Sequence, residues 1–241
     1  VDVIRPADAN ETKEAYKIAF SKKDSPTCIV LSRQVLPTIL KEEQTEVCKG
    51  AYIVSDSIKE IPDGILMASG SELCITLEAK EILKQQGLDI RVVSIPSTTL
   101  FDKQPIEYKE KILPSCVSRK MVVEMSEGAH YYKYVGCNGL VYGINKFGVS
   151  ACGPVLIKEY GFTKENIVDA FNSLEKVDYI SVHVPLNPYT KEMINDSIFT
   201  KVKPGVKLLN FSRGELVNEA DLQKAIENNI ISKYVTDFPN N

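Results

Sequence analysis

The sequence has no tryptophan, only two histidines among its 241 residues, and charges so nearly balanced that the net charge is −3. This balance gives no electrostatic basis for binding nucleic acid or an anionic membrane surface. No apolar run approaches the roughly 18 residues that a membrane-spanning helix needs, and no secretory signal opens the chain. We therefore expect a cytoplasmic protein without nucleic-acid or membrane partners.

The six cysteines lie far apart and never form a C-x-x-C pair. Such spacing is not that of a zinc site or a disulfide framework. Most of them have apolar neighbours, as in "TCIVL" and "ELCITL". We expect buried, reduced thiols, the usual state in a cytosolic protein, and no metal site.

Strand-like and helix-like segments alternate along the chain, which is typical of parallel sheets covered by helices. The sequence therefore predicts the α/β class. Residues from about 50 to 172 contain enough strands for one complete sheet, and "TCIVLS" before them reads as a strand buried on both faces. Residues 36–50, polar and interrupted by Pro37 and Gly50, are predicted to be a linker. From residue 173 the pattern restarts with three strands and two helices, a marginal unit by size.

Two polar side chains follow strand-like segments near the N-terminus. Asp8, in "IRPADANE", is placed to cap a helix, and Arg33 follows the strand "CIVLS". If the two strands are parallel neighbours, both side chains lie at one edge of their sheet. A carboxylate accepts hydrogen bonds from hydroxyls and a guanidinium binds phosphate, a pair that suits a polyhydroxylated phosphate ester. The alternative is that Asp8 only caps the helix and Arg33 only forms a surface ion pair.

Two further motifs have a structural and a functional interpretation. In "ASGSELCITLEAK" the free N–H groups of a helix could hold an anion, but we favour Ser71 as a simple helix cap. In "EMSEGAHYYKYVG" the side chains of Glu124, Glu127 and His130 are suited to acid–base chemistry, while the tyrosines that follow are typical of packing or interface residues. His130 has no partner four residues on for a metal.

The C-terminal part carries polar residues at the ends of three successive strands. His183 and Pro185 follow the strand "DYISV", the turn of Ser212 and Arg213 follows "VKLLNF", and Asp237 ends the strand in "KYVTDFP". An arginine at a strand exit is suited to hold a substrate carboxylate. The alternative is a set of ordinary strand-end loops.

A run of motifs in the first 172 residues occurs in the order and spacing of one enzyme family. They include "IRPADANE", "PTCIVLSRQ", "ILMASGSE", "RVVSIPSTTLFDKQPIEYKEKILP" and "FGVSACGPVLIKEYGFTKENIV". This part resembles transketolase. The resemblance implies that residues 1–45 are the tail of a pyrimidine-binding domain and that 50–172 form the C-terminal domain, a three-layer α/β/α sheet. It also implies that Asp8 contacts substrate hydroxyls and that Arg33 holds the phosphate of a sugar phosphate.

The last part resembles a different family. The segments "VDYISVHVPLNPYTKEMIN", "VKPGVKLLNFSRGELVNEADLQKAI" and "YVTDFP" are similar to D-3-phosphoglycerate dehydrogenase and its D-2-hydroxyacid dehydrogenase relatives. The resemblance implies that 174–241 are part of a Rossmann-type NAD-binding domain. It makes Arg213 a catalytic residue that binds the carboxylate of a phosphoglycerate-like substrate. It places His183, Pro185, Ser212 and Asp237 beside the cofactor.

Each of the two sites is incomplete in this sequence. The first part lacks the diphosphate-binding domain with its metal ligands, and the second has no G-x-G-x-x-G turn for a pyrophosphate. The parent families use thiamine diphosphate with Mg²⁺ and NAD, respectively, but we expect no cofactor on this chain alone. The opening "VDVIRP" begins inside a strand-like segment without a methionine, so we expect the natural start to lie upstream.

Three interpretations follow. The chain is a transketolase-derived polypeptide fused to a dehydrogenase fragment and inactive alone, or a non-catalytic dimerising α/β module, or a fragment that keeps weak nucleotide or sugar-phosphate binding. We expect self-association, because the pyrimidine-domain strand and "HYYKYVG" would expose apolar surface. We also expect residues 50–172 to be more ordered than the two ends.

Overall fold

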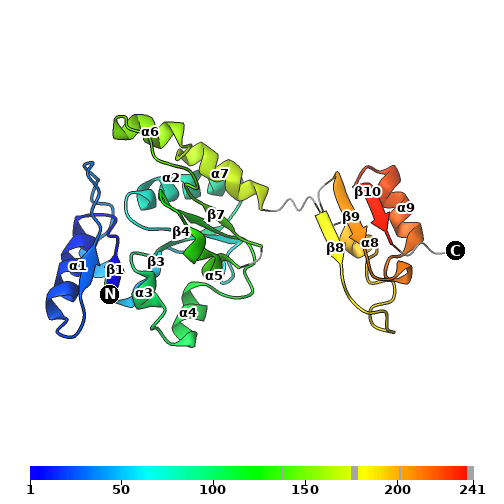
Figure 1. The fold of residues 1–241 in the computed structure, drawn as a ribbon, viewed down its shortest axis with the longest axis horizontal. Helices are drawn as coiled ribbons and strands as arrows, with labels where there is room; N and C mark the ends of the chain where they lie inside the picture. The colour runs from blue at the N-terminus through cyan, green and yellow to red at the C-terminus, as the bar shows by residue number, and fades with distance from the viewer. Residues whose placement is uncertain (137, 175–178, 201, 203, 238–241) are drawn as a thin grey trace. The chain divides into compact units, whose positions relative to one another are not determined.

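The computed structural model describes residues 1–241 except 137, 175–178, 201, 203 and 238–241. The chain forms two compact units, Val1–Phe171 and Asn172–Asn241 (Figure 1). Within the described residues, no helix is both long enough and apolar enough to cross a bilayer.

The first unit is built on a five-stranded sheet. Its strands are β3 (Tyr52–Ser55), β4 (Gly64–Ala68), β5 (Ile90–Ser94), β6 (Lys120–Val123) and β7 (Leu140–Tyr142), in the order β3-β5-β4-β6-β7. The strands β4, β5 and β6 are buried throughout, which explains their unbroken apolar sequences. The pairs are parallel as expected, except that β3 runs antiparallel to β5. Residues 56–63 connect β3 to β4 and are too few for the crossover that joins two parallel strands. The strand β3 therefore runs opposite to β4, and so also opposite to β5, which is parallel to β4.

Helices cover both faces of this sheet (Figure 1). One face carries α2 (Glu72–Gln85) and α7 (Lys164–Ser173), and the other carries α3 (Thr98–Phe101), α4 (Ile106–Ile112) and α5 (Tyr132–Val135). The helix α6 (Gly153–Glu159) precedes α7. The helix α7 packs closely, because a Cβ on Gly64 would lie 2.4 Å from the Phe171 ring. The three-layer α/β/α arrangement is confirmed.

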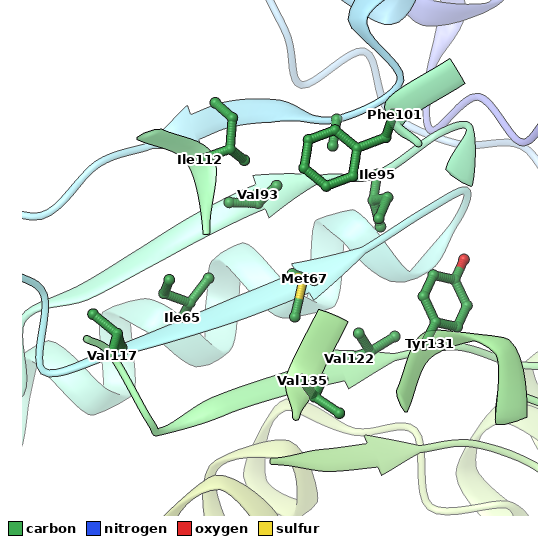
Figure 2. Packing of buried hydrophobic residues seen from close by; sticks show 11 residues of the cluster. Ile65, Met67, Val93, Ile95, Phe101, Ile112, Val117, Val122, Tyr131 and Val135 are labelled. Carbon is green, nitrogen blue, oxygen red and sulfur yellow. The ribbon is translucent and has the colours of Figure 1, made fainter. Parts of the chain in front are cut away.

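The core between the sheet and the α3–α5 layer is a single apolar cluster (Figure 2). It joins side chains of β4, β5 and β6 to one side chain from each short helix. Its members include Ile65, Met67, Val93, Ile95, Phe101, Ile112, Val117, Val122, Tyr131 and Val135. Burial on both sides of the sheet therefore holds the strand ends, and the side chains that follow them, in place.

The N-terminal segment packs against this sheet unit. It consists of β1 (Asp2–Ile4), α1 (Ala9–Ser21) and β2 (Thr27–Ile29), with β1 and β2 parallel. The predicted linker at 36–50 is instead packed into two 3₁₀ turns, Glu42–Gln44 and Val47–Lys49. Its side chains Leu40 and Val47 are buried, Val47 in a cluster with Ile4 of β1. Apolar residues inside a polar stretch thus anchor it.

Three local predictions were wrong. The strand β2 is only half-buried, because a two-stranded sheet leaves one of its faces uncovered. Four of the five described cysteines are exposed, Cys28 of β2 among them, although all five are free thiols. Ser71 stands at the start of α2 but does not cap it, because its backbone is already helical and its hydroxyl donates to Glu72 Oε2 at 2.8 Å.

The second unit is a parallel sheet in the order β10-β9-β8, made of β8 (Tyr179–Val182), β9 (Val206–Asn210) and β10 (Ile231–Thr236). Its helices are α8 (Asp196–Phe199) and α9 (Glu219–Glu227), and the 3₁₀ turn Gly214–Leu216 lies between β9 and α9. The helix α8 is short because the side chain of Asn195 caps it and Ile194 forms a β-bridge with Val217. Alternating burial along β9 fits one well-covered face, as expected for part of a Rossmann-type unit.

Candidate functional site

The ends of β1 and β2 bring the first pair of candidate residues to one edge. The two strands are parallel neighbours, with Ile4 opposite Ile29, so Asp8 and Arg33 both follow carboxyl ends at the same side. A cavity of about 250 Å³ lies there, lined by Asp8, Thr12, Ser32 and Gln34 among others. Arg33 is exposed and does not line this cavity. The expected juxtaposition of strand ends is therefore present, with Asp8 in the cavity wall.

Asp8 itself is buried and has four backbone hydrogen bonds. Its Oδ1 accepts from the N–H groups of Asn10 and Glu11 at 3.0 Å each, which caps α1. Its Oδ2 accepts from Ile39 at 3.0 Å and Leu40 at 2.9 Å. The carboxylate thus holds the start of α1 against residues 39–40. The contact of Asp8 with substrate hydroxyls stays a prediction. The hydrogen bonds of Asp8 in the structure are those of a helix cap.

Glu11 was missed by the sequence analysis. It is fully buried, and its Oε1 accepts from the Tyr52 hydroxyl and the Ser94 hydroxyl at 2.6 Å each. Its Oε2 accepts from the Ala7 backbone N–H at 2.6 Å. Burial raises the pKa of this carboxyl group. A glutamate three residues after an N-capping aspartate is a known helix-start signal that could have identified it.

Arg5 and two buried glutamates form a second unforeseen network. The chain passes from β4 to β5 on one side and then crosses to β6 on the other, so the crevice between β4 and β6 is where α/β sheets commonly bind ligands. Here the Arg5 guanidinium lies in it. One amino group contacts Glu72 Oε1 at 3.3 Å and the other pairs with Glu124 Oε1. Both carboxylates are fully buried, and Arg5 therefore provides their counter-charge.

The predicted acid–base motif around His130 is not assembled as a pair. Glu124 accepts from Ser69 and Tyr131 at 3.0 Å each and faces Arg5, while Glu127 accepts from the Ala129 backbone at 2.8 Å. No hydrogen bond joins a carboxylate to the His130 ring in the part of the chain that the structure describes. The ring lies against Tyr131 in a tilted arrangement instead, with centroids 4.1 Å apart. Burial lowers the pKa of His130.

In the second unit four of the five predicted residues converge on one cavity. It measures about 470 Å³ and is lined by His183, Val184, Pro185, Leu186, Phe211, Ser212 and Arg213. The Ser212 hydroxyl donates to the Val182 carbonyl at 3.1 Å, which ties the turn after β9 to the end of β8. His183 Nε2 and the Ser181 hydroxyl lie 2.6 Å apart. Parallel pairing of β8 and β9 explains the convergence.

Asn210 organises this edge and was also missed. It is fully buried at the end of β9, where its Nδ2 donates to the Arg213 carbonyl at 2.7 Å and its Oδ1 accepts from Ser212 N–H at 3.1 Å. A polar residue that closes an apolar strand, as in "KLLN", was the available signal. The predicted Asp237 does not line the cavity. Its backbone N–H donates to the Asn210 carbonyl at 3.3 Å and so continues the pairing of β10 with β9.

A metal ion and a nucleotide make different demands on the described residues. They contain no group of three or more His, Cys, Asp or Glu side chains that could hold a metal ion. The cavity of the second unit has polar groups for a substrate or part of a nucleotide, but the sequence offers no glycine-rich turn to cradle a pyrophosphate.

Two family models match the chain. Residues 50–163 match the transketolase-like C-terminal domain, and residues 142–241 match the NAD-binding domain of D-isomer specific 2-hydroxyacid dehydrogenases. The two matches overlap, so the second begins before the boundary between the compact units.

Individual relatives point to transketolase. The chain is 46% identical over 177 residues to the transketolase of Staphylococcus epidermidis, covering 72% of this chain and 27% of that one. It superposes on the Pichia stipitis transketolase complex with sedoheptulose-7-phosphate with a TM-score of 0.65 and 34% identity, covering 72% of this chain and 25% of that one. A split-gene transketolase, described as an inactive β4 tetramer, shares the fold with a TM-score of 0.60 at 20% identity, covering 72% and 57%.

These similarities show that most of the chain is homologous to transketolase and that residues 50–163 form a transketolase-like C-terminal domain. The chain spans about a quarter of the length of the S. epidermidis relative.

Proposed function

We propose that this chain is a transketolase-derived polypeptide fused to part of a D-2-hydroxyacid dehydrogenase. Residues 1–45 correspond to the tail of the pyrimidine-binding domain, 50–172 to the C-terminal domain and 174–241 to the dehydrogenase fragment. The observation that carries the proposal is the parallel β1–β2 pair, fastened to the five-stranded sheet through Arg5 and Glu11 in a chain homologous to transketolase.

In this proposal the edge after β1 and β2 keeps a remnant of a sugar-phosphate site. Arg33 is exposed and able to reach a phosphate, and Asp8 lines the adjacent cavity. An arginine–phosphate contact contributes about 1.5–3 kcal/mol, which after the cost of association corresponds to roughly millimolar affinity at best. The pentose phosphate chemistry of the parent family would need the remaining domains.

The chain alone is proposed to be inactive as a transketolase. We expect no turnover of xylulose 5-phosphate with added thiamine diphosphate and Mg²⁺, because the described residues hold no metal-ligating cluster. In the same samples, sugar-phosphate binding is measured by NMR titration in wild type and Arg33→Ala, and we expect the variant to bind more weakly. Turnover that disappears in Arg33→Ala would overturn the proposal.

We propose self-association through an apolar surface formed by α1 and the residues that follow β2. Phe20 and Val35 are 84% and 98% exposed, and Tyr16, Val30 and Leu31 are also exposed. Of the tyrosine motif, Tyr131 is buried and Tyr134 donates to Asp102 at 2.7 Å, while Tyr132 is exposed. The inactive tetramer of the split-gene transketolase supports this proposal.

The test is sedimentation at tens of micromolar, on the order of the range where weak contacts saturate. We expect Phe20→Ser with Val35→Ser to shift the chain toward monomer. The matched control is Phe147→Ser, since Phe147 is 99% exposed and lies after β7 instead. An equal effect of both variants, or a monomeric wild type, would contradict the role of this surface.

A second candidate function is carried by the cavity of His183, Pro185, Ser212 and Arg213. There Arg213 would bind the carboxylate of a phosphoglycerate-like substrate, with Asp237 near the nicotinamide. We expect no NAD reduction with 3-phosphoglycerate, because the pyrophosphate cradle is absent from the sequence. Any rate that is lost in Arg213→Ala would instead favour this function over the first.

We also propose a cytoplasmic location, supported by the five free thiols among the described cysteines. Cell fractionation combined with labelling of reduced thiols tests it. Recovery in an oxidising compartment with blocked thiols would contradict it.

A further inference from the structure

A cavity of about 320 Å³ lies at the end of the five-stranded sheet where β5 begins, opposite the carboxyl ends of the parallel strands near Arg5. It is formed where β3 ends, where α2 ends and where β5 begins. Ile58, Leu88 and Ile90 give it an apolar surface, and the lysines Lys59, Lys80 and Lys84 line it as well. Neither the transketolase-like nor the dehydrogenase-like site includes these residues.

Lys80 is the unusual group in this cavity. The residue is only 6% exposed, and its ammonium donates to the Ser55 hydroxyl at 2.7 Å, the Ser55 carbonyl at 3.2 Å and the Asp56 carbonyl at 2.7 Å. All three acceptors are neutral oxygens. No carboxylate oxygen lies within 4 Å of this nitrogen among the residues that the structure describes. Burial lowers the pKa of Lys80, although Asp89, Glu81 and Asp56 attract its charge from beyond contact distance.

The carboxylates of the cavity already have other partners. Asp56 pairs with Arg91 Nε at 2.7 Å and accepts from the Ser57 N–H at 2.8 Å. Asp89 accepts from the N–H groups of Ile58 at 3.0 Å and Lys59 at 2.7 Å. These bonds hold the loop after β3 against the start of β5. Asp56 and Asp89 therefore attract Lys80 without contacting its ammonium group.

A second ammonium stands one helical turn along. Lys84 follows Lys80 by four residues, so both project from the same side of α2. Lys84 is exposed and forms no ion pair within the described part of the chain, whereas Lys59 pairs with Asp63 at 2.7 Å. The last carbonyls of α2, at residues 82–84, accept from the N–H groups of Gln86, Gly87 and Leu88. The helix end therefore presents few free carbonyls that would repel an anion.

We propose that this cavity binds a small organic carboxylate with a compact apolar body. The carboxylate lies near Lys80 and Lys84, and the apolar body packs on Ile58, Leu88 and Ile90. A water molecule occupies about 30 Å³ in the liquid. A cavity of about 320 Å³ therefore has room for about ten non-hydrogen atoms. An aromatic or branched-chain acid has this size and charge.

The experiment is an NMR titration of the full ¹⁵N-labelled chain at fixed ionic strength with three probes. Benzoate carries the charge and the apolar body, benzamide the body alone, and inorganic phosphate the charge alone. We expect benzoate to shift the amide signals of Ile58, Gly87 and Asp89 saturably, with the other two probes at least about fivefold weaker. Lys84→Gln weakens benzoate binding about threefold, while the control Lys158→Gln, on the exposed side of α6, leaves it unchanged.

Lys80→Gln is expected to weaken benzoate binding at least about tenfold. Because replacing a buried residue can unfold the unit, the ammonium signal of Lys80 is also followed in the wild type, where benzoate should shift it and raise the pKa of Lys80. Equal binding of benzamide would show an apolar cavity only, and equal binding of phosphate would show unspecific charge. Each of these two results would overturn the proposal. So would a benzoate titration that does not saturate, or a Lys80 ammonium signal that benzoate does not shift.

Discussion

Glu11 joins three segments of the first unit through two carboxylate oxygens. It accepts from Tyr52 of β3, Ser94 of β5 and the backbone of Ala7. We predict that Glu11→Ala lowers the free energy of unfolding of this unit by about 3–5 kcal/mol, because three buried donors lose their acceptor. Urea denaturation measures the loss. The control Glu14→Ala, at a partly exposed position of the same helix, should change it by less than about 0.5 kcal/mol, and a similar small change in Glu11→Ala would contradict the role of the network.

The same residue makes stability depend on pH. Burial raises the pKa of Glu11 above the ordinary value of 4.5, so the folded state binds this proton more tightly than the unfolded state. Its contribution therefore favours folding most below pH 4.5 and declines as pH rises through the raised folded pKa. We predict that wild type loses up to about 1.4 kcal/mol per pH unit relative to Glu11→Gln across this window. Parallel stability curves for the two proteins would rule this out.

Arg5 supplies the positive charge for Glu72 and Glu124, which are both fully buried. Removing it leaves two uncompensated carboxylates, so we predict that Arg5→Ala destabilises the first unit by about 3–5 kcal/mol. Arg33→Ala is the matched control, since Arg33 is exposed, and it should cost less than about 0.5 kcal/mol. Thermal and urea unfolding measure both. Equal losses of unfolding free energy in Arg5→Ala and Arg33→Ala would show that the Arg5 guanidinium does not stabilise the first unit.

At the scale of elements, the turn after β9 depends on Asn210. Its amide bonds to Ser212 and to the Arg213 carbonyl hold the turn that lines the second cavity. We predict that Asn210→Ala destabilises the second unit by about 1–3 kcal/mol and speeds amide exchange at Ser212, because buried backbone groups lose their partners. The first unit should be unaffected. Gln223→Ala on the exposed side of α9 is the control, and unchanged exchange at Ser212 would contradict the prediction.

At the scale of the whole molecule, the contacts divide the chain at Phe171 and Asn172. Because Arg5, Asp8 and Glu11 tie the N-terminal segment to the sheet unit, that segment should resist proteolysis together with it. We predict that limited proteolysis yields one fragment that begins at Val1 and ends near residue 171, and not a core that begins near residue 50. Mass spectrometry identifies the fragments, and a resistant core starting near residue 50 would restore the sequence-based expectation.

Several features of this protein could be predicted from sequence alone because they arise locally. Alternation of apolar strands with amphipathic helices predicted the α/β class and most elements. The positions of Asp8, Arg33, His183 and Arg213 at strand ends followed from the same local pattern, and so did the break into two parts near residue 172. Short-range preferences and periodicity determine such features, so no knowledge of the final packing was needed.

Only the tertiary structure decided which groups meet. Arg5 lies 67 residues before Glu72, and Glu11 lies 83 residues before Ser94, so no local pattern could pair them. Packing also determined that residues 36–50 are anchored instead of free, that Asp8 has backbone partners on two segments, and that the ammonium of Lys80 is buried against the oxygens of Ser55 and Asp56. These outcomes depend on strand order and helix placement, because burial and charge pairing are properties of the assembled core and not of any single segment.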